Sequence, residues 1–198
     1  MFNWKSLKHQ LGLALLLSVL GAPLAMADPI LTVVASPAQP TPGGTVGIDL
    51  MLSDVTDLYA HQFSMSFNAA VLQLTGSTEG GLLGTGGTTY FDSGSIDNTL
   101  GTISFAFNTL IGAGPGVNGG GNLMHFDFNV ISAGVSAFDF SDVLFLDSSF
   151  NDIAVTINAA PLVVNAAVPE PGAFLLFGTG LLALALLRRN HKPAKAAI

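Results

Sequence analysis

The side chains with acid–base chemistry in the middle of the chain are two histidines and a set of carboxylates. His61 and His125 are the histidines between residues 28 and 168, and the chain has no cysteine. Paired carboxylates can hydrolyse glycosides, but the acids of residues 54–57 and 147–152 sit among turn-forming residues, and turns favour Asp on their own account. No catalytic set can be assembled from them. We therefore predict a protein that is not an enzyme, with a small glycoside hydrolase as the alternative.

The same two acidic stretches hold the candidate metal ligands. Asp54 and Asp57 lie in the first stretch, and Asp147 and Asp152 lie in the second. Ca²⁺ binds about six to eight oxygen atoms, and carboxylates in loops are its usual ligands. Neither stretch matches the EF-hand loop. These aspartates are therefore kept as calcium candidates, and no cofactor is assigned.

The basic residues are confined to the two ends of the chain. Of the 198 residues, 6 are Lys or Arg and 13 are Asp or Glu. No Lys or Arg occurs between His9 and Leu187; the cations are Lys5, Lys8, Arg188, Arg189, Lys192 and Lys195. A domain without cations has nothing to neutralise phosphates, which excludes nucleic acid as a partner.

Residues 1–27 have the three parts of a secretory signal peptide. Lys5 and Lys8 form the charged start, and Leu11–Leu20 is an apolar run that is too short to span a bilayer comfortably. Ala25-Met26-Ala27 then supplies a small-x-small cleavage site. We predict that signal peptidase cuts between Ala27 and Asp28. An uncleaved anchor is the alternative.

A second apolar segment, Gly172–Leu187, lies near the end of the chain. Its 16 residues carry no charge. A helix of this length reaches about 24 Å, less than the ~30 Å hydrocarbon core, and flanking residues or local thinning could cover the deficit. We predict a transmembrane helix over residues 172–187. Because Arg188 and Arg189 follow it, this end stays cytoplasmic and the acidic middle lies outside.

The segment Val168-Pro169-Glu170-Pro171 stands just before this predicted helix. Its two prolines keep the backbone extended where a processing enzyme would grip it. The order Pro-Glu-Pro, apolar helix and Arg pair closely resembles the PEP-CTERM sorting signal of Gram-negative bacteria. The resemblance implies an exosortase that removes the tail, with Pro169, Glu170, Pro171, Arg188 and Arg189 as sorting residues. An ordinary single-span anchor is the alternative.

Between the two ends, apolar and polar side chains alternate with the period of half-buried strands. The alternation is clear in residues 46–52, 59–67, 103–107 and 124–130, and shorter apolar runs occupy residues 30–35, 71–74, 143–146, 153–157 and 162–164. About nine strands without a helical period predict an all-β fold, a single β-sandwich. The glycine strings 84–87 and 112–121 lack the Lys of a phosphate loop and are expected to be flexible connections.

The order of these segments resembles a bacterial cohesin domain from roughly Pro29 to Val164. Pro42-Gly43-Gly44-Thr45-Val46 precedes the second strand. Phe63–Leu72 is similar to the family's aromatic-Asp-Pro-x-Val-Leu stretch, with Asn68-Ala69 in place of Asp-Pro; Asn also favours turns. The resemblance implies a nine-stranded jelly-roll sandwich, related to carbohydrate-binding modules, whose usual partner is a dockerin bound on one sheet face.

A few aromatic and histidine side chains remain to be placed. Tyr90 and Phe91 lie in a loop-like stretch and are the candidate ligand face. His125 is two residues from Asp127 along a predicted strand and so lies on the same face, which we expect to be solvated. His61 is two residues from Phe63 and so lies on the same face of its predicted strand, where we expect it at the edge of the core.

These features predict three segments: a signal peptide at 1–27, a cohesin-like β-sandwich at 28–166 and a sorting tail at 167–198. The protein is expected to cross the inner membrane of a Gram-negative bacterium, to be held transiently by its C-terminal helix, and to reach the cell surface or extracellular matrix. There its domain would bind another protein, such as a dockerin, without catalysis. The alternative is a carbohydrate-binding module associated with extracellular polysaccharide.

Removal of the signal peptide and of the sorting tail leaves a domain whose ionised residues are all acidic, apart from its histidines. Residues 28–168 contain 12 acids and no Lys or Arg, a formal charge of -12. Such a domain repels itself, and salt screens that repulsion. We expect the Tm of residues 28–168, measured by calorimetry, to rise from low to moderate NaCl. A flat response would mean that the acids are too dispersed to repel one another.

Overall fold

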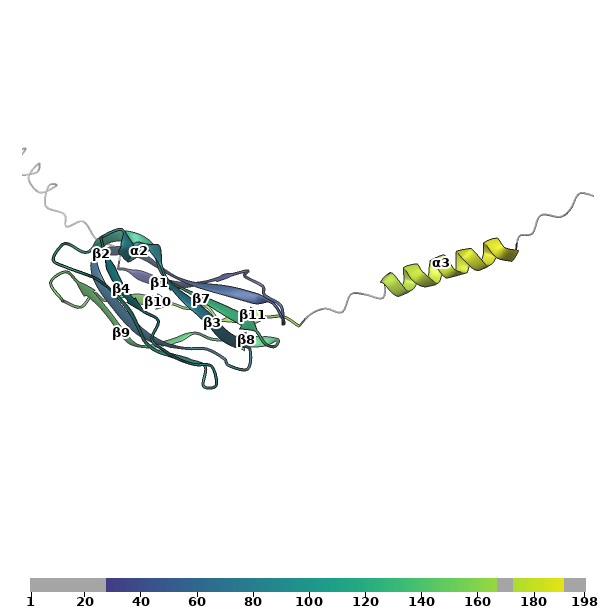
Figure 1. The fold of residues 1–198 in the computed structure, drawn as a ribbon, viewed down its shortest axis with the longest axis horizontal. Helices are drawn as coiled ribbons and strands as arrows, with labels where there is room; N and C mark the ends of the chain where they lie inside the picture. The colour runs from purple at the N-terminus through teal and green to yellow at the C-terminus, as the bar shows by residue number, and fades with distance from the viewer. Residues whose placement is uncertain (1–27, 167–172, 191–198) are drawn as a thin grey trace, which may run out of the picture.

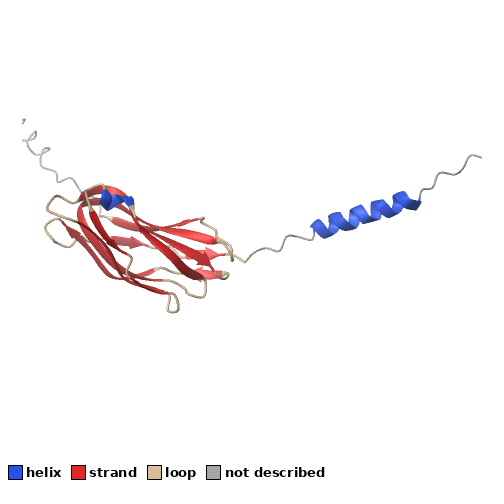
Figure 2. Ribbon diagram, in the orientation of Figure 1, coloured by secondary structure: helices blue, strands red, loops and turns tan. Residues whose placement is uncertain are grey.

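The computed structural model describes residues 28–166 and 173–190, which form strands and two helices (Figures 1 and 2). In chain order the elements are β1 (Ile30–Ser36), β2 (Thr45–Ser66), β3 (Leu72–Glu79), α2 (Gly81–Gly84), β4 (Thr89–Asp92), β5 (Ser95–Asp97), β6 (Thr102–Leu110), β7 (Val117–Val130), β8 (Gly134–Ser136), β9 (Asp139–Asp147), β10 (Thr156–Asn158), β11 (Leu162–Val164) and α3 (Ala173–Asn190).

Strand β2 belongs to both layers of the sandwich. It is 22 residues long, and its two halves pair with different strands. In the first half Leu50 lies between Val33 of β1 and Met124 of β7. In the second half His61 lies between Asn108 of β6 and Phe145 of β9. One layer is therefore β10-β1-β2-β7-β3, and the other is β9-β2-β6-β4 with β5 beside β6; β8 and β11 pair separately.

Phenylalanines fill the space between the layers. Phe63, Phe126, Phe128 and Phe145 are almost completely buried. Phe63 and Phe126 meet edge to face with ring centroids 6.5 Å apart, a favoured arrangement for aromatic pairs. The buried apolar side chains of the described residues all lie between Leu31 and Val164. Residues 28–166 therefore contain a complete core, which is what independent folding requires.

The predicted all-β sandwich is confirmed, and the predicted strand runs overlap observed strands. Two differences stand out. The runs 46–52 and 59–67 are one continuous strand, because Asp54 and Asp57 stay within β2 in left-handed backbone conformations, with φ of 56° and 60°. The short strands β4, β5 and β8 were not predicted, and the expected loop at Tyr90 and Phe91 is part of β4.

The prediction that residues 112–121 form a flexible connection is wrong for their second half. Strand β7 begins at Val117 and includes Gly119–Gly121. A Cβ on Gly116 would lie 2.4 Å from the carbonyl of Asp57, and one on Gly120 would lie 2.7 Å from the carbonyl oxygen of Leu52. These glycines therefore allow β7 to approach β2 more closely than any other residue could.

The C-terminal helix α3 begins at Ala173, within the predicted helix. Among the described residues, no helix combines the length and hydropathy needed to cross a membrane. This finding does not support the transmembrane helix predicted over residues 172–187. The 18 residues of α3 end in Arg188-Arg189-Asn190, and a helix of that length reaches about 27 Å, short of the ~30 Å hydrocarbon core.

His61 lies deep between the layers rather than at the edge of the core. It is 2 % exposed, and its ring stacks against Phe63 and Phe145, with centroids 6.1 and 5.8 Å away. Neither ring nitrogen has a hydrogen-bond partner. Burial lowers the pKa of His61 from 6.5 to about 4, because the low-dielectric core disfavours the charged imidazolium.

We expect His61→Phe to make the domain less sensitive to acid. In the unfolded chain the imidazole binds its proton near pH 6.5, whereas in the fold it binds it near pH 4. The unfolding free energy therefore falls as the pH drops through this window, by about 3 kcal/mol over its full width. Urea unfolding of both proteins at pH 7.5 and 4.5 measures the difference. An equal loss in the two proteins would contradict a neutral, buried ring.

Candidate protein-binding face

The second layer has one side on the core and the other in solvent. Along β2, His61, Phe63 and Met65 are buried. Because side chains alternate along a strand, the residues between them point outward. We call the outward side of β9, β2, β6 and β4 the outer face; its residues include Ala60, Gln62, Ser64, Ser66, Tyr90, Phe105, Phe107, Asp142 and Leu144.

A bulge in β6 turns Phe105 out of the core. The pairing of β6 with β2 shifts between Phe63↔Ala106 and Met65↔Ile103, so the two residues Ser104 and Phe105 lie opposite the single residue Ser64. Phe105 has a φ of 56° and is 55 % exposed. Its backbone N–H donates to the Ser64 Oγ at 3.1 Å. A positive φ is unfavourable for a bulky residue, so the neighbours must hold it in place.

Gly94, which lies between β4 and β5, packs against the backbone of the β6 bulge. A Cβ at position 94 would lie 2.4 Å from the Ser104 carbonyl oxygen and 2.7 Å from the Ala106 nitrogen. Only glycine fits so close to the backbone of β6.

A second bulge lies in β9, on the other side of β2. The pairing shifts between Gln62↔Leu144 and Ser64↔Ser141, and Asp142 within this shift has a φ of 52°. Asp tolerates the left-handed region better than most residues do. Bulges bend a strand and redirect its side chains. The two bulges therefore flank adjacent residues of β2, with the β6 bulge opposite Ser64 and the β9 bulge opposite Phe63.

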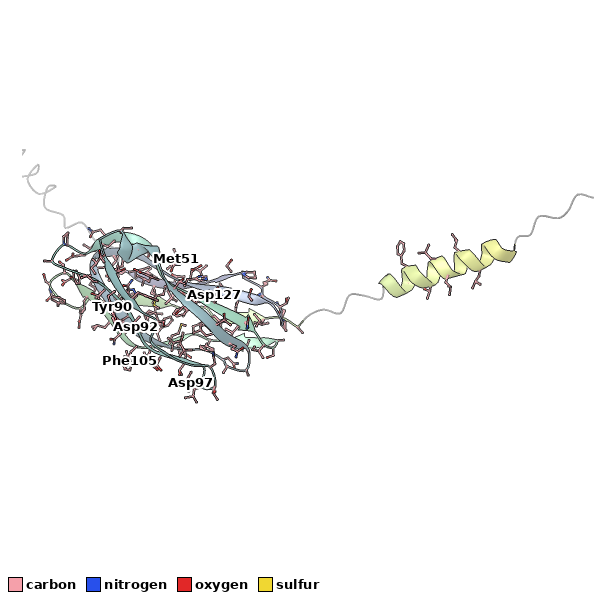
Figure 3. All side chains as sticks on the ribbon, viewed as in Figure 1. Met51, Tyr90, Asp92, Asp97, Phe105 and Asp127 are labelled. Atoms are coloured by element: carbon pink, nitrogen blue, oxygen red, sulfur yellow. The ribbon has the colours of Figure 1, made fainter. Side chains whose placement is uncertain are left out.

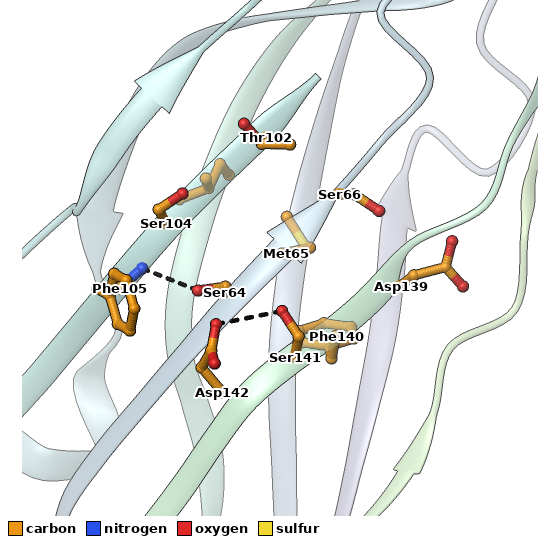
Figure 4. A pocket seen from close by; sticks show the side chains of 11 residues that line it. Ser64, Met65, Ser66, Thr102, Ser104, Phe105, Asp139, Phe140, Ser141 and Asp142 are labelled. Atoms are coloured by element: carbon orange, nitrogen blue, oxygen red, sulfur yellow. Dashed lines mark hydrogen bonds between the residues drawn. The ribbon is translucent and has the colours of Figure 1, made fainter. Parts of the chain in front are cut away.

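A cavity of about 330 Å³ lies between the two bulges (Figure 4). Phe105 stands on the β6 side, and Asp142 with Ser141 stands on the β9 side. We call it the Phe105–Asp142 cleft; the remaining lining residues are Ser64, Met65, Ser66, Thr102, Ile103, Ser104, Asp139 and Phe140.

Tyr90 extends the outer face along β4, and Phe91 does not. Tyr90 is 55 % exposed, and its ring lies 5.7 Å from that of Phe107. Phe91 follows it in the strand and packs against the core. The predicted pair is therefore divided between the two sides of β4, and Tyr90 alone remains a candidate contact residue. Figure 3 shows Tyr90, Asp92 and Phe105 on the same side of the sandwich.

Sequence reasoning missed Phe105, Asp142 and Ser64. The alternation of residues 103–107 placed Ile103, Phe105 and Phe107 on one face. In the structure Ile103 and Ala106 are buried while Phe105 is exposed, because the bulge shifts the phase of the strand. No local pattern marks this bulge, since Ser64 is 41 residues away in sequence.

The calcium candidates Asp54, Asp57, Asp147 and Asp152 stay a prediction, and their carboxylates have other partners where the structure shows them. Within the described residues no group of three or more His, Cys, Asp or Glu side chains could hold a metal ion. Asp57 instead accepts hydrogen bonds from Ser148 Oγ, at 2.7 Å, and from Gly116 N–H; these bonds lower its pKa. Asp147 accepts bonds from the Asn151 side chain and from the backbone N–H groups of Ser149 and Asn151, which lower its pKa as well. These carboxylates brace loops.

His125 lies on the outward side of the first layer, as predicted. Its Nδ1 is 2.7 Å from Asp49 Oδ1, and its Nε2 is 3.2 Å from Asp127 Oδ1. The Asp49 hydrogen bond raises the pKa of His125 above 6.5, against the opposing effect of partial burial. Asp49 also accepts a bond from Asn122 Nδ2. The cluster holds neighbouring β2 and β7 together and offers no nucleophile.

Some predicted residues lie outside the described part of the chain. These are Ala25 and Ala27 of the signal cleavage site and Pro169, Glu170 and Pro171 of the sorting motif. Asp28 is the first described residue and is exposed, and Arg188 and Arg189 lie in the last turn of α3.

Two family models match the chain, and no curated protein matches it. The cohesin domain covers residues 31–160, which is most of the sandwich. The PEP-CTERM protein-sorting motif covers residues 167–189. Both resemblances noted in the sequence are thereby confirmed, and PEP-CTERM motifs indicate exosortase-sorted export.

Solved cohesins share the fold at low sequence identity. A non-cellulosomal cohesin from the archaeon Archaeoglobus fulgidus is 13 % identical with a TM-score of 0.56, covering 76 % of this chain and 98 % of its own. The second type II cohesin module of the adaptor scaffoldin ScaA from Acetivibrio cellulolyticus is 14 % identical with a TM-score of 0.59, covering 77 % and 98 %. The sixth cohesin of scaffoldin B from the same organism, solved with a Cel5 dockerin, is 15 % identical with a TM-score of 0.57, covering 70 % and 100 %.

Cohesin domains are non-catalytic modules that bind other proteins. The family model matches well over half of this chain, and the nine-stranded network around β2 has the matching fold. The chain belongs to the cohesin-domain family.

Proposed function

We propose that this protein is an exported binding module that holds a protein partner on its outer face. The observation that carries the proposal is the pair of bulges on either side of β2, opposite Phe63 and Ser64. Each places a non-glycine residue at positive φ, Phe105 at 56° and Asp142 at 52°. Strained backbone persists only where surrounding contacts enforce it, and it concentrates at functional sites.

The composition of the outer face suits a protein partner. Phe105 and Tyr90 are each 55 % exposed, and Leu144 is 38 % exposed. Exposed aromatic and aliphatic side chains on a rigid sheet supply contact area at low entropic cost. On β2, Ala60, Gln62, Ser64 and Ser66 run down the middle of this face, and all but Gln62 are small. A ridge of a partner, such as a helix, would fit along this line.

The chemical identity of that partner is a further part of the proposal. Several of the similar solved cohesins are complexes with dockerins. A dockerin-like protein is therefore the first candidate partner. We place binding on the outer face because the bulges and the exposed aromatic rings lie there.

A glycan is the second candidate ligand, and Tyr90 is the observation that favours it. Its ring is exposed on a β-sheet surface beside Phe107, and sugars stack on such rings. A glycan array with residues 28–166 and the Tyr90→Ala variant distinguishes the two ligands. Binding that disappears in the variant supports the glycan, and an array without binding removes it.

Export and processing complete the proposed function. The chain would leave the cytoplasm through its signal peptide and would be cut in the sorting tail by an exosortase, which directs it to the cell surface or extracellular matrix. The PEP-CTERM match at residues 167–189 supports this route.

The intact mass of the exported protein tests this route. We expect a protein that begins at Asp28 and ends close to Glu170, because the two cleavage signals lie there. Expression in an exosortase-deficient strain is the control, and there the tail should remain. A mass that includes residues through Ile198 in the wild-type strain would contradict processing by an exosortase.

We expect Phe105→Asn to lose partner binding without a loss of stability. Asn removes the exposed ring and tolerates positive φ, which costs a bulky residue about 1–2 kcal/mol. Phe150→Asn is the matched control, because Phe150 is 69 % exposed at a φ of 62° and lies outside the outer face. Both variants should keep or raise the Tm.

Capture from culture supernatant, followed by calorimetry of the captured partner, measures the binding. At least a 10-fold weakening in Phe105→Asn, with Phe150→Asn unchanged, is the expected result for a central aromatic contact. Equal binding by both variants would move the binding site away from the outer face.

A further inference from the structure

We infer that the Phe105–Asp142 cleft binds a cationic side chain, an arginine or a lysine, which the partner supplies. The inference rests on the proposed function, because it specifies what the outer face recognises. It concerns the chemistry of one cleft and can be tested without knowing the partner.

The first argument is that the cleft contains carboxylates and that the domain has no Lys or Arg that could form an ion pair with them. Asp139 and Asp142 both line the cleft. Residues 28–166 contain no Lys or Arg, and within the described residues both ion pairs are made by His125, on the other layer. Among the described residues, one hydrogen bond reaches these two carboxylates: Ser141 Oγ donates to Asp142 Oδ2 at 3.3 Å. A Lys or Arg side chain in the cleft must therefore come from outside residues 28–166, and the processed domain has none of its own.

The second argument is the shape and chemistry of the lining. The cleft of about 330 Å³ has an aromatic ring on the β6 side and carboxylates on the β9 side, and the hydroxyls of Ser66, Thr102 and Ser104 also line it. A guanidinium group is flat, donates several N–H bonds and is attracted to the face of an aromatic ring. A lysine ammonium would use the same carboxylates as a point charge with three donors. The lining offers many oxygen acceptors, which favours arginine.

The third argument is that the cleft is already formed. Phe105 is held by the Ser64 Oγ and by the close approach of Gly94, and Asp142 is held in its own bulge. These contacts fix the backbone from which both side chains project, and a backbone fixed before binding loses little entropy when a ligand arrives. The cleft can therefore recognise a single side chain at modest cost.

Charge complementarity decides against a second copy of this domain, residues 28–168, as the occupant. A partner domain with the same 12 acids and no Lys or Arg would bring only like charge to the cleft. The negative domain would instead steer a basic partner toward itself, with a strong dependence of the association rate on salt.

Small cations provide a direct test. Amide spectra of ¹⁵N-labelled residues 28–166 are recorded during titration with methylguanidinium, with methylammonium and with the neutral methylurea. We expect saturable shifts at Ser64, Thr102, Phe105 and Asp142 with methylguanidinium, at a Kd on the order of millimolar. Methylammonium should shift the same amides more weakly, and methylurea should not shift them.

The control variants separate the cleft from the general charge of the domain. Asp142→Asn and Asp54→Asn each remove one charge at an aspartate of positive φ, 52° and 56°, a conformation that Asn also adopts. Asp142→Asn should weaken methylguanidinium binding at least about 5-fold, as expected for a charge-assisted contact. Asp54→Asn should leave binding unchanged. Equal effects of the two variants, or shifts that never saturate, would overturn the inference.

The same variants show which of the two proposals is wrong, the cation site in the cleft or the docking of a partner on the outer face. If Phe105→Asn abolishes partner capture while Asp142→Asn and Asp54→Asn bind the partner equally, the partner does not place a cation in the cleft and the inference is wrong, although the proposed function stands. If methylguanidinium binds as expected but Phe105→Asn still captures the partner, the cleft is a cation site and the proposed docking on the outer face is wrong.

Discussion

The length of strand β2 is the constraint on which the rest of this structure depends. A strand has two hydrogen-bonding edges, and a strand of ordinary length serves two neighbours in one sheet. With 22 residues, β2 serves β1 and β7 in its first half and β6 and β9 in its second half. The two layers are therefore fixed relative to each other by one continuous backbone, and the phenylalanine core is enclosed between them.

The same strand explains how a sheet surface becomes a specific site. A regular sheet presents a flat surface, and side chains that alternate along it offer little shape. On the outer face the neighbours of β2 each carry an extra length of chain near Ser64, which lifts Phe105 on one side and Asp142 on the other. The Ser64 hydroxyl accepts the N–H that the β6 bulge would otherwise leave unpaired. The cleft is thus a consequence of two local irregularities in an otherwise regular layer.

A feature of this fold could be predicted from the sequence when it is set by neighbouring residues, and not when it is set by contacts between distant segments. The alternation in residues 46–52 and 124–130 correctly indicated strands, because each side chain responds to the same core. The phase of β6 was wrong, because the exposure of Phe105 is set by Ser64 and Gly94, which lie in other strands or turns. Gly116 and Gly120 looked like flexible linker residues for the same reason. Their function is to let β7 pass close to β2, and this contact is not visible in the neighbouring sequence.

The uneven distribution of charge connects the fold, the cleft and the route out of the cell. A sandwich whose sheets pack through Phe, Leu and Val needs no ion pairs, so the domain can dispense with Lys and Arg altogether. The one cluster of possible ion pairs among the described residues places His125 between Asp49 and Asp127. Apart from carboxylates such as Asp57 and Asp147 that accept hydrogen bonds within loops, the remaining acids in the described part of the chain have no stabilising partner that needs their charge. Those that line the Phe105–Asp142 cleft keep their charge unpaired within the domain, and only a partner that brings a cation can neutralise them.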